Sequence, residues 1–246
     1  MQSINERINI WRAVLPRVDI FFAAKVLFDD QINTICHQNG TGFDVASEFE
    51  MREVLKLGVS PDKCIYANPV KQSDHIKVAR ELGVKKMTFD SIEELHKIKK
   101  EFPQAECILR IAVETTTAMY NLSEKFGAFM EDVPKILQAG KKLGLRLKGV
   151  AFHTGSGGVT FESYRSSLVN ARTIFDMASG LGLQEMDFLD IGGGFTLICP
   201  GTGKNFEEVA PMIGKLIDDV FPEPNIQIIA EPGRYIVESM AFMASR

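Results

Sequence analysis

The sequence has one tryptophan, four cysteines and no excess of positive charge among its 246 residues. Its formal net charge of −4 argues against the basic surface that nucleic-acid binding needs, so we expect no nucleic-acid partner. Cys36, Cys64, Cys107 and Cys199 form no C-x-x-C pair, which is untypical of a disulfide framework or a zinc site. His153 has no second histidine or carboxylate at metal-ligand spacing either. We therefore expect reduced thiols, no bound metal and a cytoplasmic protein.

Long apolar runs are also missing. None approaches the ~20 residues of a membrane span, and the N-terminus lacks the apolar stretch of a signal peptide. Hydrophobic residues make up 45% and charged residues 24% of the chain, which is ordinary for a globular protein. The length is usual for one (β/α)8 barrel, so we expect a single soluble domain without a membrane partner.

What is present is an alternation of short apolar runs with helix-like stretches. The runs lack clean polar alternation, which is typical of parallel strands covered on both faces. We predict strands at residues 20–25, 42–46, 64–67, 86–89, 107–113, 147–153, 187–191 and 226–231. This pattern favours an α/β fold, a (β/α)8 TIM barrel over residues 20–246 after a leading segment at residues 1–19. A doubly wound open sheet is the alternative, but the glycine fingerprint that usually follows its first strand is absent.

Helix signals occupy the intervening segments. Apolar residues gather on one face of the segments 133–143 and 206–221, which predicts amphipathic helices there. Ser91 followed by Glu94 has the spacing of a capping box at a helix start. Leu-Gly pairs at 57–58, 82–83, 143–144 and 181–182 predict helix ends that lead into strands.

Lys25 directly follows five apolar residues and is expected at the carboxyl end of the first strand, on the catalytic face of a barrel. Desolvation there would disfavour its charged form and make the amine nucleophilic, so that it could form an imine with an aldehyde. For an isolated lysine, the alternative is a solvated side chain at a strand end.

A phosphate site is expected opposite Lys25, because loops after the last strands of this fold commonly hold phosphate. Gly192–Gly194 would bare backbone N–H groups, and Arg234 would add a charge-assisted hydrogen bond. Ser156 follows the sixth strand and could donate its hydroxyl to the same group. A tight turn would explain the glycines alone, but three loops aimed at one point favour an anion site.

His153 ends the sixth strand, either as a core residue satisfied by the backbone or as a flat ring stacked on a heteroaromatic ligand. Glu231 ends the eighth strand, where an unpaired buried charge would be very costly. Its partner is either Arg234 or a pyridinium nitrogen, and protonation of such a ring makes it an electron sink. Other charged residues expected at the pocket are Asp44, Glu50 and Arg110.

Nine segments carry a resemblance to a known family. They are LPRVDIFFAAK, GTGFDVAS, IYANPVKQ, MTFDS, LRIA, KFGA, FHTGSG, LDIGGGF and IIAEPGRY, and they run in order from about residue 10 to 240. Together they resemble the barrel domain of the eukaryotic ornithine decarboxylase family. This family is a fold-type III group of pyridoxal-phosphate decarboxylases with an alanine-racemase-like barrel. The resemblance implies pyridoxal 5'-phosphate as the cofactor.

The resemblance also implies a role for each site residue. Lys25 would form the Schiff base with the cofactor, His153 would stack on its ring, and Glu231 would hold the pyridine nitrogen. The other pocket and cofactor-binding residues would be Asp44, Glu50 and Arg110 around the Schiff base, and Ser156, Gly193, Gly194, Pro232, Gly233 and Arg234 at the phosphate end.

The implied reaction converts ornithine to putrescine in polyamine biosynthesis. The family is homodimeric, and Lys125 resembles a lysine close to the partner subunit. The family's C-terminal β-domain, which completes the shared active site, has no counterpart here, and Cys199 does not match its cysteine motif. Val26-Leu27 after Lys25 and Thr196-Leu197 after the glycines also depart from the family pattern. We therefore expect a chain that binds pyridoxal phosphate but is inactive alone.

A non-catalytic regulator resembling antizyme inhibitor is the alternative function. Residues 72–96 resemble the antizyme-contacting region, although a solvated charged face explains them equally well. The residues Lys25, Asp44, Arg110, His153 and Glu231 favour an enzyme, because a pure binding protein has no physical need for them. A monomeric barrel that handles pyridoxal phosphate is a third possibility, but its motifs match less well.

Overall fold

The computed structural model describes residues 3–113, 126–155, 161–184, 186–199 and 203–239. Eight parallel strands close into a barrel in sequence order, with the last strand paired to the first. Their bounds are β1 (Val18–Ala23), β2 (Gly42–Val45), β3 (Cys64–Tyr66), β4 (Lys86–Phe89), β5 (Glu106–Ile111), β6 (Arg146–Phe152), β7 (Phe188–Asp190) and β8 (Gln227–Ala230). The predicted (β/α)8 barrel is confirmed, and the alternative of an open sheet is wrong.

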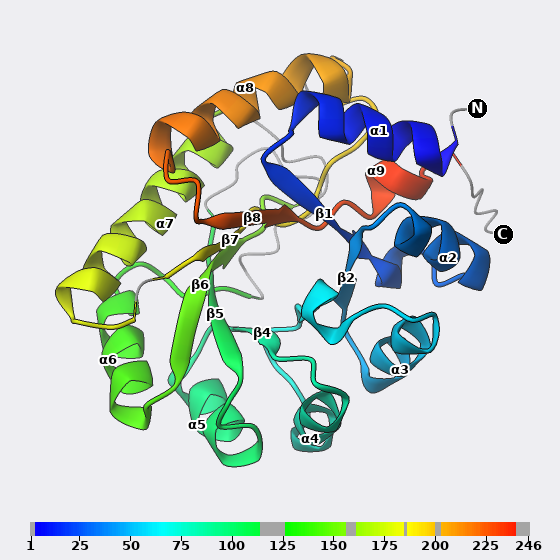
Figure 1. Cartoon of the computed structure of the whole chain (residues 1–246). Helices are drawn as coiled ribbons and strands as arrows, with labels where there is room; N and C mark the ends of the chain where they lie inside the picture. The colour runs from blue at the N-terminus through cyan, green and yellow to red at the C-terminus, as the bar shows by residue number, and fades with distance from the viewer. Residues whose placement is uncertain (1–2, 114–125, 156–160, 185, 200–202, 240–246) are drawn as a thin grey trace, which may run out of the picture.

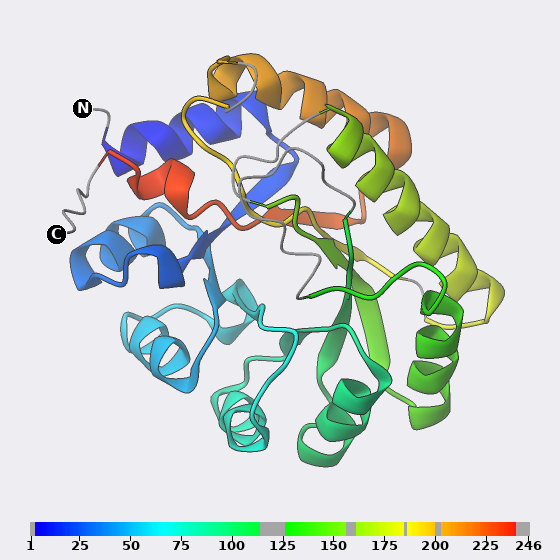
Figure 2. The same cartoon turned by 180° about the vertical axis from the view of Figure 1, so that it is seen from behind.

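Helices form an outer ring around the strands, as Figure 1 and Figure 2 show from opposite sides. Their bounds are α1 (Ile4–Val14), α2 (Asp30–Gln38), α3 (Glu48–Lys56), α4 (Ser73–Leu82), α5 (Ile92–Glu101), α6 (Val133–Leu143), α7 (Phe161–Gly180), α8 (Phe206–Val220) and α9 (Arg234–Val237), with two 3-10 turns, η1 (Ala24–Val26) and η2 (Pro61–Lys63). In the described ranges, no helix has the length and apolar character needed to cross a membrane.

The leading segment contains a helix that packs into this ring. Helix α1 lies beside α2 and α8 (Figure 1). Its Trp11 is fully buried, stacks on Phe206 with ring centroids 5.0 Å apart, and donates its indole N–H to the Val18 carbonyl at 2.9 Å. The aromatic contact joins α1 to α8, and the hydrogen bond joins α1 to the start of β1. Strand β1 begins two residues earlier than expected.

The predicted helix signals are largely confirmed. Helix α6 has the predicted bounds, and Gly83 and Gly144 end their helices in the left-handed conformation, with φ of 78° and 62°. The Ser91 hydroxyl accepts from the Glu94 amide at 3.3 Å, but the Glu94 carboxylate binds lysines in place of the Ser91 amide. Only half of the predicted capping box therefore forms, because an ammonium is a stronger partner than a backbone amide.

The barrel interior is narrow and apolar. A separate buried cluster contains Phe21, Ile65, Ala67, Ile108, Ala151, Phe188 and Ile229, while a larger cluster fills the space between strands and helices. Gly149 in β6 permits close approach of β7, because a Cβ at this position would lie 1.8 Å from the Phe188 carbonyl oxygen. The polar residues at the carboxyl ends of the strands therefore rest on a closely packed and rigid interior.

We predict that Gly149→Ala destabilises the barrel by about 1–3 kcal/mol, because the added methyl group collides with backbone. Gly180→Ala is the matched control, since nothing lies within 4 Å of a Cβ at the end of α7. Urea unfolding of both variants measures the difference. Equal unfolding midpoints for Gly149→Ala and the parent chain would contradict this account of the interior.

Candidate active site

A cavity of about 250 Å3 opens where the carboxyl ends of the strands meet. We call it the site cavity; it is lined by Lys25, Ala46, Ala67, Asn68, Pro69, Arg110, Phe126, His153 and Glu231. A small hollow adjoins it and shares Ala67, Arg110, His153 and Glu231 with it, adding Thr88 and Asp190. The two spaces together are thus lined by loops and strand ends from all eight strands.

Lys25 does not end the first strand as predicted. Strand β1 ends at Ala23, and Lys25 lies in the 3-10 turn η1 that follows. Its Nζ donates to Asp44 Oδ2 at 2.5 Å, from a side chain that is 46% exposed, while Asp44 in β2 is fully buried. The other Asp44 oxygen, Oδ1, has no hydrogen-bond partner within the described part of the chain.

The expected charge state of Lys25 is corrected as well. Desolvation lowers its pKa, but the carboxylates of Asp44 and Glu231 outweigh this effect, so that the pKa of Lys25 rises above its ordinary value. The amine is therefore a well-held ammonium, because opposite charges close by stabilise the charged form more than partial burial penalises it. To act as a nucleophile, it must first give up a proton, and Asp44 is the group in contact with it.

His153 follows β6 and is neutral. Its Nδ1 accepts a hydrogen bond from the Gly155 amide at 2.9 Å, which places the proton of the neutral ring on Nε2. Desolvation, together with the nearby charges of Arg110 and Lys25, lowers the pKa of His153 to about 3. The ring also lies against the glycine loop, since a Cβ at Gly193 would be 3.0 Å from Nε2.

Glu231 shares a hydrogen bond with the carboxyl group of Asp190. No ion pair joins Glu231 to Arg234 in the described residues. Its partner is Asp190 at the end of β7, whose Oδ1 also accepts from the Gly192 amide at 2.8 Å. Burial raises the pKa of Asp190 to about 7. Burial and the Asp190 charge hold the pKa of Glu231 well above its ordinary range. The Glu231 carboxyl group therefore holds its proton more tightly than an exposed glutamate does, which lessens the need for a cationic partner.

The predicted phosphate loops lie close to these side chains. A Cβ at Gly193 would lie 2.7 Å from the Glu231 carbonyl oxygen, and one at Gly233 would lie 2.3 Å from Val26 Cγ2, so neither position has room for a side chain. The amides of Gly193, Gly194 and Gly233 have no hydrogen-bond partner among the described residues. Free backbone N–H groups in such a loop are suited to an anion. Arg234 begins α9 next to them.

Some predicted and some unpredicted residues complete the rim. Glu50 Oε2 accepts from the Ala46 amide at 2.5 Å, and burial, with a contribution from Asp44, raises the pKa of Glu50. The Arg110 guanidinium lies 5.3 Å from the centre of the Phe126 ring. Ser156 and Lys125 lie outside the described residues. Pro232 stands between Glu231 and Gly233.

Sequence reasoning missed three polar residues that line these spaces, namely Asn68, Thr88 and Asp190. Each belongs to a segment that was recognised, IYANPVKQ, MTFDS or LDIGGGF. Asp190 had a usable signal, because a carboxylate at the carboxyl end of a barrel strand faces the catalytic side. Asn68 and Thr88 had none. Phe126, in the segment KFGA, also lines the site cavity.

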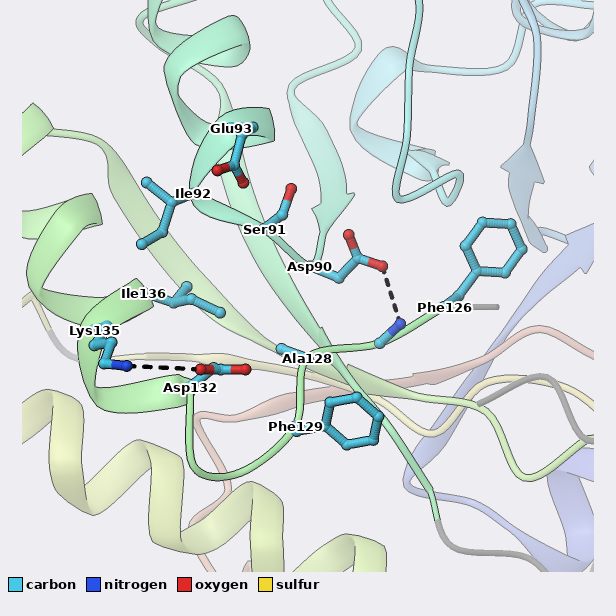
Figure 3. Close-up of a pocket in the computed structure, with 11 residues that line it drawn as sticks. Asp90, Ser91, Ile92, Glu93, Phe126, Ala128, Phe129, Asp132, Lys135 and Ile136 are labelled. Atoms are coloured by element: carbon cyan, nitrogen blue, oxygen red, sulfur yellow. Dashed lines mark hydrogen bonds and ion pairs between the residues drawn. The ribbon is translucent and has the colours of Figure 1, made fainter. Parts of the chain in front are cut away.

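A larger cavity of about 470 Å3 lies outside this site, between the start of α5 and the loop that leads into α6 (Figure 3). It shares only Phe126 with the site cavity. Asp90 lines this larger cavity and accepts a hydrogen bond from the Gly127 amide at 2.9 Å. Asp132 and Lys135 also line it and form an ion pair at 4.0 Å. We place the active site in the smaller cavity, because it holds the lysine, the histidine and the buried carboxyl groups.

The chain is similar to known proteins over nearly its whole length. A family model for the pyridoxal-binding domain of pyridoxal-dependent decarboxylases matches residues 1–238. The chain belongs to this family. It is 41% identical over 245 residues to ornithine decarboxylase from Saccharomyces cerevisiae, covering 99% of this chain and 51% of that protein. It is 43% identical over 234 residues to antizyme inhibitor 2 from Xenopus laevis, covering 94% of this chain and 50% of that protein.

A solved structure gives the same result. The pyridoxal-binding domain matches lysine decarboxylase from Selenomonas ruminantium in complex with pyridoxal phosphate and cadaverine. The TM-score is 0.84 at 36% identity, over 95% of this chain and 58% of that one. The chain thus spans about half the length of the curated relatives it matches and somewhat more of this structure.

The cofactor of this family is pyridoxal phosphate, and the residues present fit it. An amine stands at one side of the site cavity, and a neutral flat ring and a buried carboxyl group line the same space. The unpartnered amides of Gly193, Gly194 and Gly233 are suited to the phosphate. The orphaned Asp44 Oδ1 is a further acceptor available to a ligand. These are the groups that a phosphorylated pyridine aldehyde needs.

We predict that His153→Phe makes the domain less sensitive to acid. The folded state holds His153 neutral down to a pKa of about 3, whereas the unfolded chain takes up its proton near 6.5. Stability from this group is therefore lost as pH falls below 6.5 in the parent chain but not in the variant. Near pH 5 the gap between the two unfolding free energies should shift by about 1–2 kcal/mol in favour of the variant.

Urea unfolding at several pH values measures that shift. His96→Phe, at an exposed position of α5, is the control for the exchange of a histidine for a phenylalanine outside the site. If His153→Phe keeps the same stability difference from the parent chain at pH 8 and pH 5, the histidine is not held neutral.

Proposed function

We propose that this chain is the cofactor-binding barrel of a pyridoxal-phosphate-dependent decarboxylase that acts on a basic amino acid. Ornithine is the preferred substrate, which gives putrescine for polyamine biosynthesis. The single observation that carries the proposal is the site cavity, where Lys25, His153 and Glu231 face one space beside free glycine amides. The ornithine decarboxylases that match nearly the whole chain support the choice of substrate.

Each residue has a chemical task in this proposal. Lys25 binds the aldehyde end of the cofactor, and Asp44 Oδ2 holds the proton that the amine gives up. His153 offers a neutral ring face to the pyridine, and the loops at Gly193 and Gly233, with Arg234 and Ser156, bind the phosphate. When bound, pyridoxal phosphate supplies an electron sink for the electrons released as carbon dioxide leaves.

Glu231 controls the proton at the ring nitrogen. Its raised pKa favours the protonated form, and it shares a hydrogen bond with Asp190. Facing a pyridine nitrogen, the same carboxyl group can pass that proton to the ring and remain as its counter-ion. The buried pair of Asp190 and Glu231 can thus supply a proton to the pyridine nitrogen of the cofactor.

The proposal includes a cytoplasmic homodimer. Cys36, Cys64 and Cys107 are buried free thiols, in keeping with a reducing compartment. The dimer is carried over from the family, in which Lys125 would approach the partner subunit. We also keep the proposal that the 246-residue chain binds cofactor without turnover by itself. A decarboxylation assay on this polypeptide decides that point.

A second candidate is a regulator that binds antizyme without catalysis. The 43% identity to antizyme inhibitor 2 from Xenopus laevis favours it. Lys25, His153 and Glu231 line one cavity and Asp44 holds Lys25, and an antizyme-binding surface gives no physical reason for that arrangement. Binding of pyridoxal phosphate through Lys25 supports the enzyme. Antizyme binding without cofactor binding would support the regulator.

We predict that Lys25→Ala abolishes the ~420 nm absorbance of lysine-bound pyridoxal phosphate, because no other amine lines the site cavity within the described residues. Lys135→Ala, at the edge of the larger cavity, is the matched control and should keep the band. Titration of both variants and the parent chain with pyridoxal phosphate makes the measurement. A parent chain with no band, or a band that survives Lys25→Ala, would refute the proposed function.

We also predict that Glu231→Gln raises the Kd for pyridoxal phosphate by about ten- to a hundredfold, because an amide cannot form the charge-assisted hydrogen bond to the ring nitrogen. Glu93→Gln at the larger cavity removes a carboxyl group from outside the site and serves as the control. Titration at neutral pH compares the two. Equal affinities in both variants would remove Glu231 from its assigned role.

A further inference from the structure

Lys71 is a buried lysine that the proposed chemistry does not use. It lies beyond the end of β3, and its side chain is 0% exposed. Its Nζ donates to the carbonyl oxygens of Thr88 at 2.6 Å, Asn68 at 3.2 Å and Pro69 at 3.3 Å. The same nitrogen is 2.8 Å from Glu94 Oε1. Fully buried lysines are rare, so this arrangement calls for a physical reason.

The three carbonyl groups belong to the walls of the candidate site. Asn68 and Pro69 line the site cavity, and Thr88, at the end of β4, lines the adjoining hollow. The Lys71 ammonium therefore bonds to the same loop that faces the cavity, and it ties that loop to the neighbouring strand. One side chain joins both parts of the wall.

Few other contacts hold this loop. It connects β3 to α4 without regular structure. Apart from those of Lys71, its hydrogen bonds in the described residues run from the Ala67 amide to the Val45 carbonyl at 3.2 Å, from the Val70 amide to Asn68 Oδ1 at 3.4 Å, and from the Ile76 amide to the Gln72 carbonyl at 3.1 Å. Pro69 is buried, whereas Val70 is 56% exposed. Lys71 is thus the side chain that joins the Asn68 and Pro69 carbonyls to β4 and α5.

Helix α5 anchors the lysine in turn. Glu94 Oε1 accepts from the Lys71 amide at 3.3 Å, and Glu94 Oε2 lies 2.6 Å from Lys97 Nζ. Lys97 Nζ also donates to the Lys71 carbonyl at 2.6 Å. Both the backbone and the side chain of Lys71 are therefore fixed to a rigid element, which is what a support for a binding wall requires.

We propose that Lys71 is a positioning residue for the cofactor pocket, holding the Asn68–Pro69 wall against β4 in the place that pyridoxal phosphate requires. The choice of ligand rests on the proposed function. The salt bridge between Lys71 and Glu94 does not by itself require a lysine, because buried ion pairs can often be replaced by apolar pairs without loss of stability. The carbonyl bonds differ, because no apolar side chain can replace a donor shared by three acceptors.

The test separates loop position from fold stability. Lys71→Met removes the donor, and the double variant Lys71→Met/Glu94→Gln also removes the buried charge that the single change leaves behind. Lys86→Met is the matched control, because Lys86 is also a buried lysine that donates to a carbonyl, that of Asp62 at 2.7 Å, but at the opposite end of β4. Each variant is examined by urea unfolding, by hydrogen exchange of peptides spanning residues 64–72, and by titration with pyridoxal phosphate.

We expect both Lys71 variants to exchange faster at residues 64–72 and to bind pyridoxal phosphate about ten- to a hundredfold more weakly, since small displacements of a supporting wall are costly. The double variant should regain stability relative to Lys71→Met without regaining affinity. Lys86→Met should lose stability but keep its Kd within about twofold of the parent chain.

A double variant with parental exchange at residues 64–72, or with parental affinity, would overturn the proposal. So would an equal loss of affinity in Lys86→Met, because the effect would then follow stability alone. If the parent chain itself binds no pyridoxal phosphate, the proposed function fails. The exchange comparison still decides in that case whether Lys71 holds the loop.

Discussion

The contact between Lys25 and Asp44 is the interaction on which the rest of the site depends. Lys25 lies outside the strand ladder, in a short turn, so the barrel backbone alone does not fix its amine. Asp44 does, because it is fully buried in β2, opposite Ala23 in the β1–β2 register. A buried carboxylate needs a cation, and this one has Lys25 at 2.5 Å. Barrel closure thus delivers the amine to the cavity through a side chain of the next strand.

The charged groups around Lys25 and Asp44 nearly balance one another. Three buried carboxyl groups, Asp44, Asp190 and Glu231, face two cations, Lys25 and Arg110, while His153 stays neutral. Burial and the charges of neighbouring carboxylates raise the pKa of both Asp190 and Glu231, so a proton held by this pair offsets the surplus negative charge. A ligand with a basic ring nitrogen can take that proton, and its phosphate can use the glycine amides that have no partner among the described residues. The charges of the pocket therefore complement those of the cofactor.

Local pattern was enough to predict the barrel, because each apolar run and each Leu-Gly helix end marks its own element. Lys25, His153 and Glu231 could be predicted because strand ends of a barrel share one face. The charge state of Lys25 could not, since it depends on carboxylates from β2 and from the end of β8. The partner of Glu231 was also missed, although β7 and β8 are neighbours in the predicted barrel, because no sequence pattern marks two carboxyl groups that hydrogen-bond to each other. Lys71 gave no signal, since most lysines are exposed.

Lys25 and Lys71 show how one residue type serves two purposes on the same rim. Lys25 is half exposed, with one carboxylate close by and open space beside it, so its amine can exchange partners. Lys71 is enclosed, and its donors are occupied by carbonyl oxygens and Glu94, so it has no capacity left for a ligand. A reactive amine needs an Nζ that can exchange its hydrogen-bond partners, whereas a supporting amine needs all its donors occupied. The two lysines meet these opposite requirements at the ends of β1 and β3, on either side of the strand that carries Asp44.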